Sequence, residues 1–70
     1  MTARRLSPPW KVIEHPESFE VRDANGQNLA YVYFDEDEAR RDMLKRLTKD
    51  EAWRVAANIA KLPELLKAPE

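Results

Sequence analysis

The chain has no cysteine, a single glycine and a single histidine among its 70 residues. Without cysteine it has neither a disulfide framework nor a cysteine-ligated metal site. One glycine excludes a glycine-rich phosphate-binding loop, which needs several. His15 has no second histidine or cysteine to help it bind a metal ion or activate a nucleophile, so we interpret it as a turn residue. Catalytic groups can converge from distant positions, but these absences predict a protein that is not an enzyme and has no catalytic residue, cofactor or metal site.

Long apolar runs and an excess of one charge are also missing. No run approaches the roughly 20 apolar residues that cross a bilayer, so we expect no membrane segment. The first ten residues, MTARRLSPPW, contain two arginines but no apolar segment after them, so they do not resemble a secretory signal. We therefore expect a cytoplasmic protein. Twelve basic and thirteen acidic residues give a net charge of −1, which argues against nucleic acid as the partner.

The remaining composition is that of one small globular domain. Apolar residues make up 43% of the chain and charged residues 36%, a balance typical of folded rather than disordered chains. A chain this short buries only about 60% of its unfolded surface, so we expect modest stability. We predict a flexible N-terminal arm over residues 1–9, a single domain over residues 10–67 and a tail over residues 68–70.

Two helices are predicted in the second half of the chain. The sequence TKDE at residues 48–51 has the pattern of a capping box, and apolar residues recur behind it at helical spacing as far as Leu62. A shorter helix follows the DEDE run at residues 35–38, with Asp35 as its expected N-cap. Adjacent carboxylates at a helix start point in different directions, so we interpret this run as serving the helix dipole rather than a metal ion. Pro63 ends the long helix or begins a short last turn, residues 63–67.

Three strands are predicted before the helices. The segments at residues 10–14, 19–22 and 29–34 are rich in β-branched and aromatic residues. Between the second and third, Asp-Ala-Asn-Gly at residues 23–26 is the strongest turn signal, because Asn-Gly supplies the positive φ angles that hairpins need. The predicted fold class is α+β: a three-stranded antiparallel sheet followed by two helices packed on one face (β-β-β-α-α), with a short C-terminal turn after Pro63.

The hairpin loop decides which face of the third strand is buried, because a slip of one residue reverses every side chain. A loop of two or four residues places Ala30 and Val32 on the face of Phe19 and Val21. A loop of three residues would instead bury the alternate positions, Tyr31 among them. We favour the first register, because Asp-Ala-Asn-Gly suits a four-residue type I loop ending in a left-handed glycine.

The expected core follows from this register and from the helical spacing. The sequence does not decide which alternate side chains of the first strand face inward, so either Trp10 or Ile13 belongs to the core. The expected core residues are Trp10 or Ile13, Val12, Phe19, Val21, Ala30, Val32, Phe34, Met43, Leu44, Leu47, Val55, Ile59, Leu62 and Leu66.

The favoured register leaves an aromatic stripe on the outer face of the sheet. It contains Leu29, Tyr31 and Tyr33, to which Trp10 is added as a further candidate. Exposed apolar patches mark partner sites, where tyrosine and tryptophan are enriched. An ordinary amphipathic sheet face, packed by lysine and arginine stems, is the other interpretation of the same pattern. Our leading hypothesis is a small non-enzymatic protein-interaction module whose partner is another protein or a second copy in a homodimer.

The alternative hypothesis is a nucleic-acid-associated protein. Arg4 and Arg5 would supply a basic arm, and the residues between Arg40 and Arg46 form the densest basic cluster. The same helix carries acidic residues that neutralise these arginines locally. A solvated, salt-bridged helix face is therefore the better account of that cluster.

Three stretches carry a resemblance: DANG at residues 23–26, LAYVY at 29–33 and AANIAKLPELL at 56–66. Through them, residues 10–67 resemble a group of very short, uncharacterised bacterial proteins, a domain of unknown function. A looser similarity extends to small phage-encoded proteins with a DA-x-G hairpin and a terminal ANA-x-x-IA-x-x-PELL helix. The resemblance implies a small single-domain bacterial protein. It brings no activity, so it assigns no functional residue.

Overall fold

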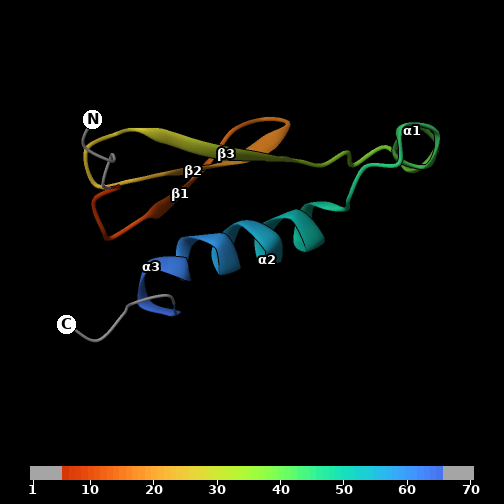
Figure 1. Cartoon of the computed structure of the whole chain (residues 1–70). Helices are drawn as coiled ribbons and strands as arrows, with labels where there is room; N and C mark the ends of the chain where they lie inside the picture. The colour runs from red at the N-terminus through yellow and green to blue at the C-terminus, as the bar shows by residue number, and fades with distance from the viewer. Residues whose placement is uncertain (1–5, 66–70) are drawn as a thin grey trace, which may run out of the picture.

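The computed structural model describes residues 6–65, so most of the expected arm, the tail and Leu66 lie outside it. A three-stranded antiparallel sheet in the order β1-β2-β3 is followed by helices, which confirms the α+β class and the β-β-β-α-α order (Figure 1). The strands are β1 (Lys11–Glu14), β2 (Ser18–Arg22) and β3 (Asn28–Tyr33). The helices are α1 (Glu38–Leu44), α2 (Lys49–Ala60) and α3 (Leu62–Leu65), the last with Pro63 at its second position.

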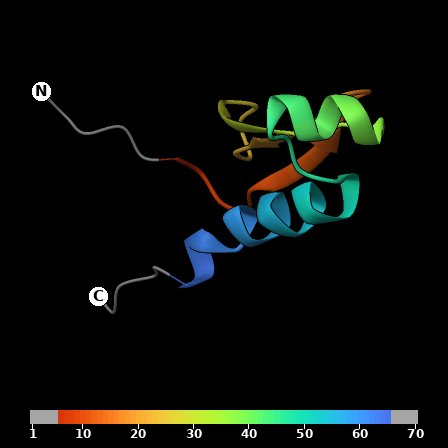
Figure 2. The same cartoon turned by 90° about the vertical axis from the view of Figure 1, so that its right-hand side faces the viewer.

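Helix α2 forms the second layer of the domain and lies across one face of the sheet (Figures 1 and 2). Its predicted capping box is confirmed: the Thr48 hydroxyl accepts from the Glu51 backbone N–H at 3.1 Å, and the Glu51 carboxylate accepts from the Thr48 N–H at 2.9 Å. Ala52 and Ala56 are fully buried on the side facing the strands. Because alanine is small, the helix backbone can approach the sheet closely at these two positions.

The favoured hairpin register is confirmed. Phe19 pairs with Val32 and Val21 pairs with Ala30. Directly opposed residues share a face, so these four side chains point together toward α2. The turn contains the expected left-handed glycine, since Gly26 has φ 86° and donates its N–H to the Asp23 carbonyl at 3.1 Å.

The loop is nevertheless one residue longer than expected. A β-bulge lies opposite the step from Val21 to Arg22: Val21 pairs with Ala30 while Arg22 pairs with Asn28, so Leu29 is the extra residue. A bulge turns its extra residue away from strict alternation. Leu29 therefore packs against the core and does not continue the outer stripe.

The sequence left open which side chains of β1 face the core, and the pairing of β1 with β2 decides this. Val12 lies opposite Val21, on the core side, whereas Ile13 lies opposite Glu20, on the outer side. Trp10 also packs against the core. The buried core consists of Phe19, Val21, Val32, Phe34, Ala52 and Ala56, and the partly buried side chains around it are Trp10, Val12, Leu29, Ala30, Leu47, Ile59 and Ala60.

Helix α1 corrects several predictions. Met43 and Leu44, expected in the core, are 79% and 49% exposed, and Val55 of α2 is exposed as well. Within residues 6–65, α1 packs against no other helix or strand, so α2 alone covers the sheet. The reason is that Phe34 forms a parallel bridge with Leu47. The segment between these two residues contains α1, and it extends away from the sheet and comes back beside the point where it started.

The N-terminal segment corrects the predicted arm in part. Ser7 donates its N–H to the Asp23 carboxylate at 3.1 Å and accepts the Ala24 N–H at 2.8 Å. Its hydroxyl also accepts from the Asn25 side-chain amide at 2.9 Å. Ser7 is therefore fastened to the β2–β3 loop rather than being part of a free arm.

Candidate functional site

Two tyrosines on the outer face of β3 form the centre of the candidate site. Tyr31 and Tyr33 are 50% and 51% exposed, and their rings stack with centroids 6.1 Å apart. The His15 ring lies 6.3 Å from the Tyr31 ring, and the Arg46 guanidinium lies 5.7 Å from the centroid of Tyr33. Successive contacts thus join four side chains, which we call the tyrosine row: His15, Tyr31, Tyr33 and Arg46.

A buried carboxylate supports the Tyr31 end of the row. Glu20 of the central strand lies opposite Tyr31, and its side chain is only 3% exposed. It accepts hydrogen bonds from Arg22 (Nε at 2.8 Å and Nη2 at 3.0 Å) and from Asn28 Nδ2 at 2.6 Å. His15 Nε2 lies 2.7 Å from the same carboxylate.

These contacts determine the charge of Glu20. The Arg22 guanidinium above all, followed by His15 and Asn28, lowers the pKa of Glu20 from 4.5 to about 2. Contact with Glu20 in turn raises the pKa of Arg22. A carboxylate held ionised and surrounded by donors is a poor general base, because a base needs a pKa near the working pH and an open lone pair. We infer that Glu20 orients its neighbours rather than reacting.

A second buried carboxylate supports the Tyr33 end. The Asp35 side chain is 3% exposed and accepts from Arg40 at Nε (2.6 Å) and Nη2 (3.2 Å), while Arg46 Nη1 lies 3.8 Å away. The Arg40 hydrogen bonds and the Asp37 backbone N–H at 2.9 Å hold the pKa of Asp35 below its usual value. The sequence-based prediction that Asp35 is the N-cap of α1 is therefore wrong. Asp37 is the cap and accepts from the Arg40 N–H.

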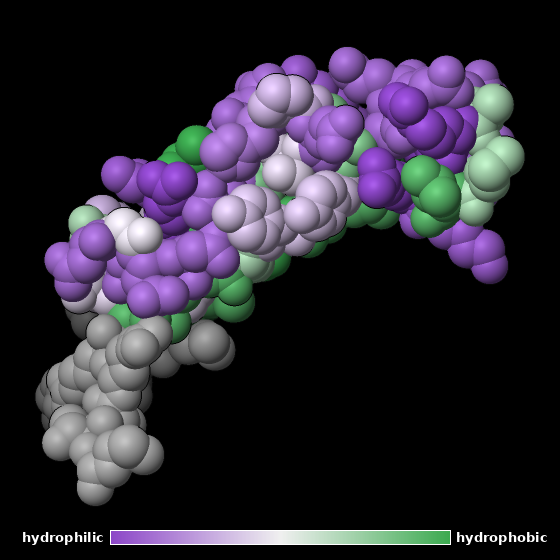
Figure 3. Space-filling model, turned by 90° about the horizontal axis from the view of Figure 1, so that it is seen from above, coloured by the Kyte–Doolittle hydropathy of each residue, from purple (hydrophilic) through white to green (hydrophobic). Residues whose placement is uncertain are grey.

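The three arginines that pair with the two buried carboxylates, Arg22, Arg40 and Arg46, keep exposed surface, and the acidic Glu17 and Asp37 lie near Arg40. Lys11 and Arg40 are exposed, and Arg22 and Arg46 are partly exposed. Arg22 and Arg40 form their pairs through one edge of the guanidinium, so they keep further N–H donors for a ligand. The face seen in Figure 3 is accordingly covered mostly by hydrophilic side chains, with paler ones near its centre.

The structure brings together two of the four predicted partner-binding residues. Tyr31 and Tyr33 lie side by side at the surface, as the register predicted. Leu29 and Trp10 pack against the core instead. Leu29 does so because of the bulge, and Trp10, which lies just before β1, has the same parity as the core-facing Val12. The sequence placed Arg46 in the basic cluster of the alternative hypothesis but did not predict its contact with Tyr33, since no local signal indicates that a residue after α1 returns to lie over a strand.

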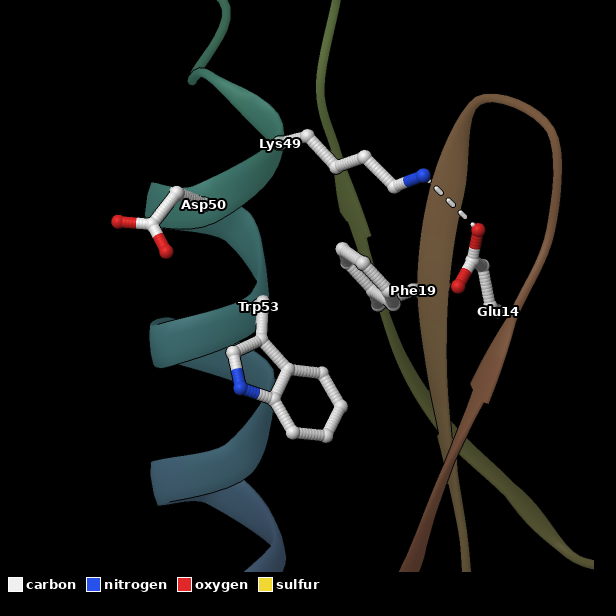
Figure 4. A pocket seen from close by; sticks show the side chains of 5 residues that line it. All are labelled: Glu14, Phe19, Lys49, Asp50 and Trp53. Carbon is white, nitrogen blue, oxygen red and sulfur yellow. Dashed lines mark ion pairs between the residues drawn. The ribbon is translucent and has the colours of Figure 1, made fainter.

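A second feature is a shallow, open groove of about 470 Å³ between the end of β1 and the start of α2 (Figure 4). Its lining residues are Glu14, Phe19, Lys49, Asp50 and Trp53. Lys49 and Glu14 form an ion pair at 3.0 Å, which raises the pKa of Lys49. The exposed Trp53 ring meets Phe19 edge-on. The groove offers an aromatic wall for an apolar group, but its lining contains no nucleophile paired with a base.

Neither a metal site nor a membrane span is found in the part of the chain that the structure describes. Over residues 6–65, no three histidine, cysteine or carboxylate residues converge as they would to hold a metal ion. Among the same residues, no helix is both long and apolar enough to pass through a bilayer.

Comparisons with protein-family models, with curated proteins and with solved structures find no match to this chain. The resemblance to short bacterial proteins therefore stays a prediction.

Proposed function

We propose that this chain is a small non-enzymatic protein-interaction module that binds its partner through the tyrosine row. The observation that carries the proposal is the stacked, half-exposed pair of Tyr31 and Tyr33 on the face of the sheet that no helix within residues 6–65 covers. Tyrosine gives a large contact area at a low entropy cost, because it has only two rotatable side-chain bonds. Its hydroxyl keeps the free surface hydrated, so the pair is compatible with a protein that is free in solution.

The surroundings of the two rings favour binding by keeping them in place. Glu20 fixes Arg22 and His15 beside Tyr31, and Asp35 fixes Arg46 beside Tyr33. A surface whose side chains are already ordered loses less conformational entropy on association. The partly exposed arginines at both ends would add polar contacts around an aromatic centre, an arrangement typical of interfaces.

The test is capture of a partner by the purified chain compared across matched variants. Tyr31→Ser combined with Tyr33→Ser should abolish capture of a given protein while the fold, followed by circular dichroism, is retained. Trp53→Ser is the control, because it removes another half-exposed aromatic residue, on α2, away from the row. The captured protein, once purified, should shift NMR signals of the outer face of β1–β3. Capture that survives the double tyrosine change would refute the proposal.

One observation favours nucleic acid as a second candidate partner. Both carboxylates along the row are buried, and exposed tyrosines flanked by cations can stack bases and contact phosphates. In this version the binding residues are those of the row, with Arg40 and Arg46 at one end, whereas Arg4 and Arg5 lie outside the described residues. The net charge of −1 opposes it.

Fluorescence anisotropy with single-stranded oligo(dT) and oligo(U) separates the two candidates. Nucleic-acid binding should weaken steeply with salt and disappear in the double tyrosine variant. Absence of binding at low salt would leave protein as the partner class.

A further inference from the structure

Two basic side chains stand directly opposite each other on the outer face of the sheet. Lys11 of β1 pairs with Arg22 of β2, and the Cβ atoms of directly opposed residues lie roughly 5 Å apart. Both belong to the face of Glu20: Lys11 is two positions from Ile13, the residue opposite Glu20, and Arg22 donates to the Glu20 carboxylate. Like charges directly opposed across strands destabilise a sheet, so an anion bound between them would relieve a repulsion.

The buried Glu20 cancels only one of these two positive charges. Its carboxylate accepts from Nε and Nη2 of Arg22, at 2.8 and 3.0 Å. Lys11 is exposed and forms no ion pair with another residue of 6–65. The two cations and the one carboxylate therefore leave an excess of one positive charge at this end of the outer face.

Arg22 keeps one edge of its guanidinium for an incoming group. A guanidinium has five N–H donors, and Glu20 takes one on Nε and one on Nη2. Over residues 6–65, Trp10 Nε1 is the only buried side-chain polar atom without a hydrogen-bond partner. Arg22 Nη1, which donates to no described residue, is therefore open to solvent. The edge formed by Nη1 and Nη2 presents two parallel donors, the geometry that fits both oxygens of a carboxylate.

An apolar surface lies beside the basic pair. Ile13, Glu20 and Tyr31 stand opposite one another across the three strands. Glu20 in the middle is buried, whereas Tyr31 is half exposed and Ile13 is partly exposed. These residues are two positions along the strands from Lys11 and Arg22, a distance of roughly 6.6 Å. Residues i and i+2 of an extended peptide have the same spacing, so one such segment can reach both places.

We propose that the outer face of the sheet binds an extended acidic segment of a protein partner, in which an aspartate or glutamate is two positions from an apolar residue. The carboxylate lies between Lys11 and Arg22, on the free edge of the guanidinium, and the apolar side chain packs on Tyr31. This inference rests on the function proposed above and names the partner class of the same surface.

The charges around the outer face favour an acidic peptide over a nucleic acid. One carboxylate cancels the single excess charge of the basic pair. A nucleic-acid strand carries a phosphate on every nucleotide, and further phosphates would approach Glu17 and Asp37, which lie near Arg40 at the Tyr33 end of the surface. Like charges brought together in this way oppose binding. The net charge of −1 acts in the same direction.

NMR titration of the whole chain with two capped peptides tests the proposal. The peptides are Thr-Leu-Thr-Glu-Thr and the same sequence with glutamine in place of glutamate. The glutamate peptide should shift the Arg22 Nε and Tyr31 signals and bind about tenfold more tightly than the glutamine peptide, the usual effect of a charge-assisted hydrogen-bonded pair. Equal binding of the two peptides would overturn the proposal. So would the absence of shifts at these two residues with tens of millimolar glutamate peptide.

Substitution of Lys11 provides the sharper arm of the experiment. Its side chain is exposed and outside the core, so its variants should fold. Lys11→Gln should weaken binding of the glutamate peptide about two- to fivefold and leave binding of the glutamine peptide unchanged. Lys11→Glu makes the local excess negative and should instead prefer Thr-Leu-Thr-Lys-Thr. Lys61→Gln, at an exposed position at the end of α2, is the matched control and should change neither affinity. A Lys11→Glu variant that still prefers the glutamate peptide would overturn the proposal.

Two outcomes separate this inference from the function proposed above. If the glutamate and glutamine peptides bind equally well and both shift the Tyr31 and Tyr33 signals, the acidic preference is overturned while the tyrosine row remains a protein-binding surface. If only single-stranded oligo(dT) shifts these signals, with a steep dependence on salt, both proposals are overturned, because the partner is then a nucleic acid.

Discussion

Glu20 and Arg22 stand two residues apart on β2 and turn toward each other on the outer face of the sheet. Arg22 donates to both oxygens of the Glu20 carboxylate, at 2.8 Å from Nε and at 3.0 Å from Nη2. Side chains at i and i+2 of a strand share a face, and the flat guanidinium fork fits the carboxylate. The pair is what allows a full negative charge to lie beneath the surface beside Tyr31.

The stability of the protein should depend on pH through this carboxylate. Its pKa is lowered in the folded chain from 4.5 to about 2, with Arg22 as the largest cause, so the unfolded chain binds the proton more readily. The contribution of Glu20 is therefore fully present above about pH 4.5 and is lost as the pH falls toward 2. Asp35 and Glu51 act in the same direction, since their pKa values are also lowered. Urea unfolding at a series of pH values measures the effect.

Glu20→Gln should remove part of this pH dependence. The variant should be less stable than the wild type at pH 7, because Arg22 loses the carboxylate it is paired with, and its stability should change less between pH 5 and pH 2. Glu38→Gln, at an exposed position of α1, is the control and should leave the curve unchanged. An unaltered slope in Glu20→Gln would show that other groups govern the acid transition.

Gly26 should tolerate asparagine better than alanine. Its φ of 86° is unfavourable for residues with a Cβ, and a Cβ built there meets nothing within 4 Å. The cost is therefore one of backbone conformation: about 1 kcal/mol for Gly26→Ala and less for Gly26→Asn, which adopts left-handed conformations more easily. Chemical denaturation of both variants gives the difference. Equal stability of the two would contradict the backbone explanation.

Thr48→Ala should destabilise the protein by about 1 kcal/mol, the usual cost of losing an N-cap. The Thr48 hydroxyl accepts from the Glu51 N–H at 3.1 Å, and without it that donor at the start of α2 has no side-chain partner. Thr48→Ser keeps the oxygen and serves as the control. Since α2 is the helix that covers the sheet, a two-state transition at lower denaturant concentration is expected. A Thr48→Ala variant as stable as Thr48→Ser would rule out a role for the cap.

Ala56→Leu should cost about 1–3 kcal/mol, the typical effect of forcing extra methylenes into a packed core. Ala56 is fully buried between α2 and the sheet. Val55→Leu, at the neighbouring exposed position, is the matched control and should change stability by less than about 0.5 kcal/mol. Similar losses in both variants would mean that α2 is not held as closely to the strands as the structure shows.

The sequence by itself determined the features that depend on residues close together in the chain. The capping box needs only Thr48 and Glu51, three positions apart, and the left-handed turn needs Gly26 beside Asn25. Alternation along the two hairpin strands then placed Phe19 and Val32 on one face. The cap and the turn each close within a few residues, and strand alternation has a period of two, so the local pattern contains what is needed to predict them.

The tertiary structure decided which charged side chains are buried and where α1 lies. Helical spacing predicted Met43 in the core. The bridge between Phe34 and Leu47 instead joins the two ends of the segment that contains Met43, and this segment lies away from the sheet. That closure returns Arg46 to Tyr33 and Asp35, a contact that no local pattern could predict. The physical reason is that the free energy of burying Glu20 and Asp35 depends on which donors the whole fold brings within hydrogen-bond distance, whereas a cap or a turn depends only on its own few residues.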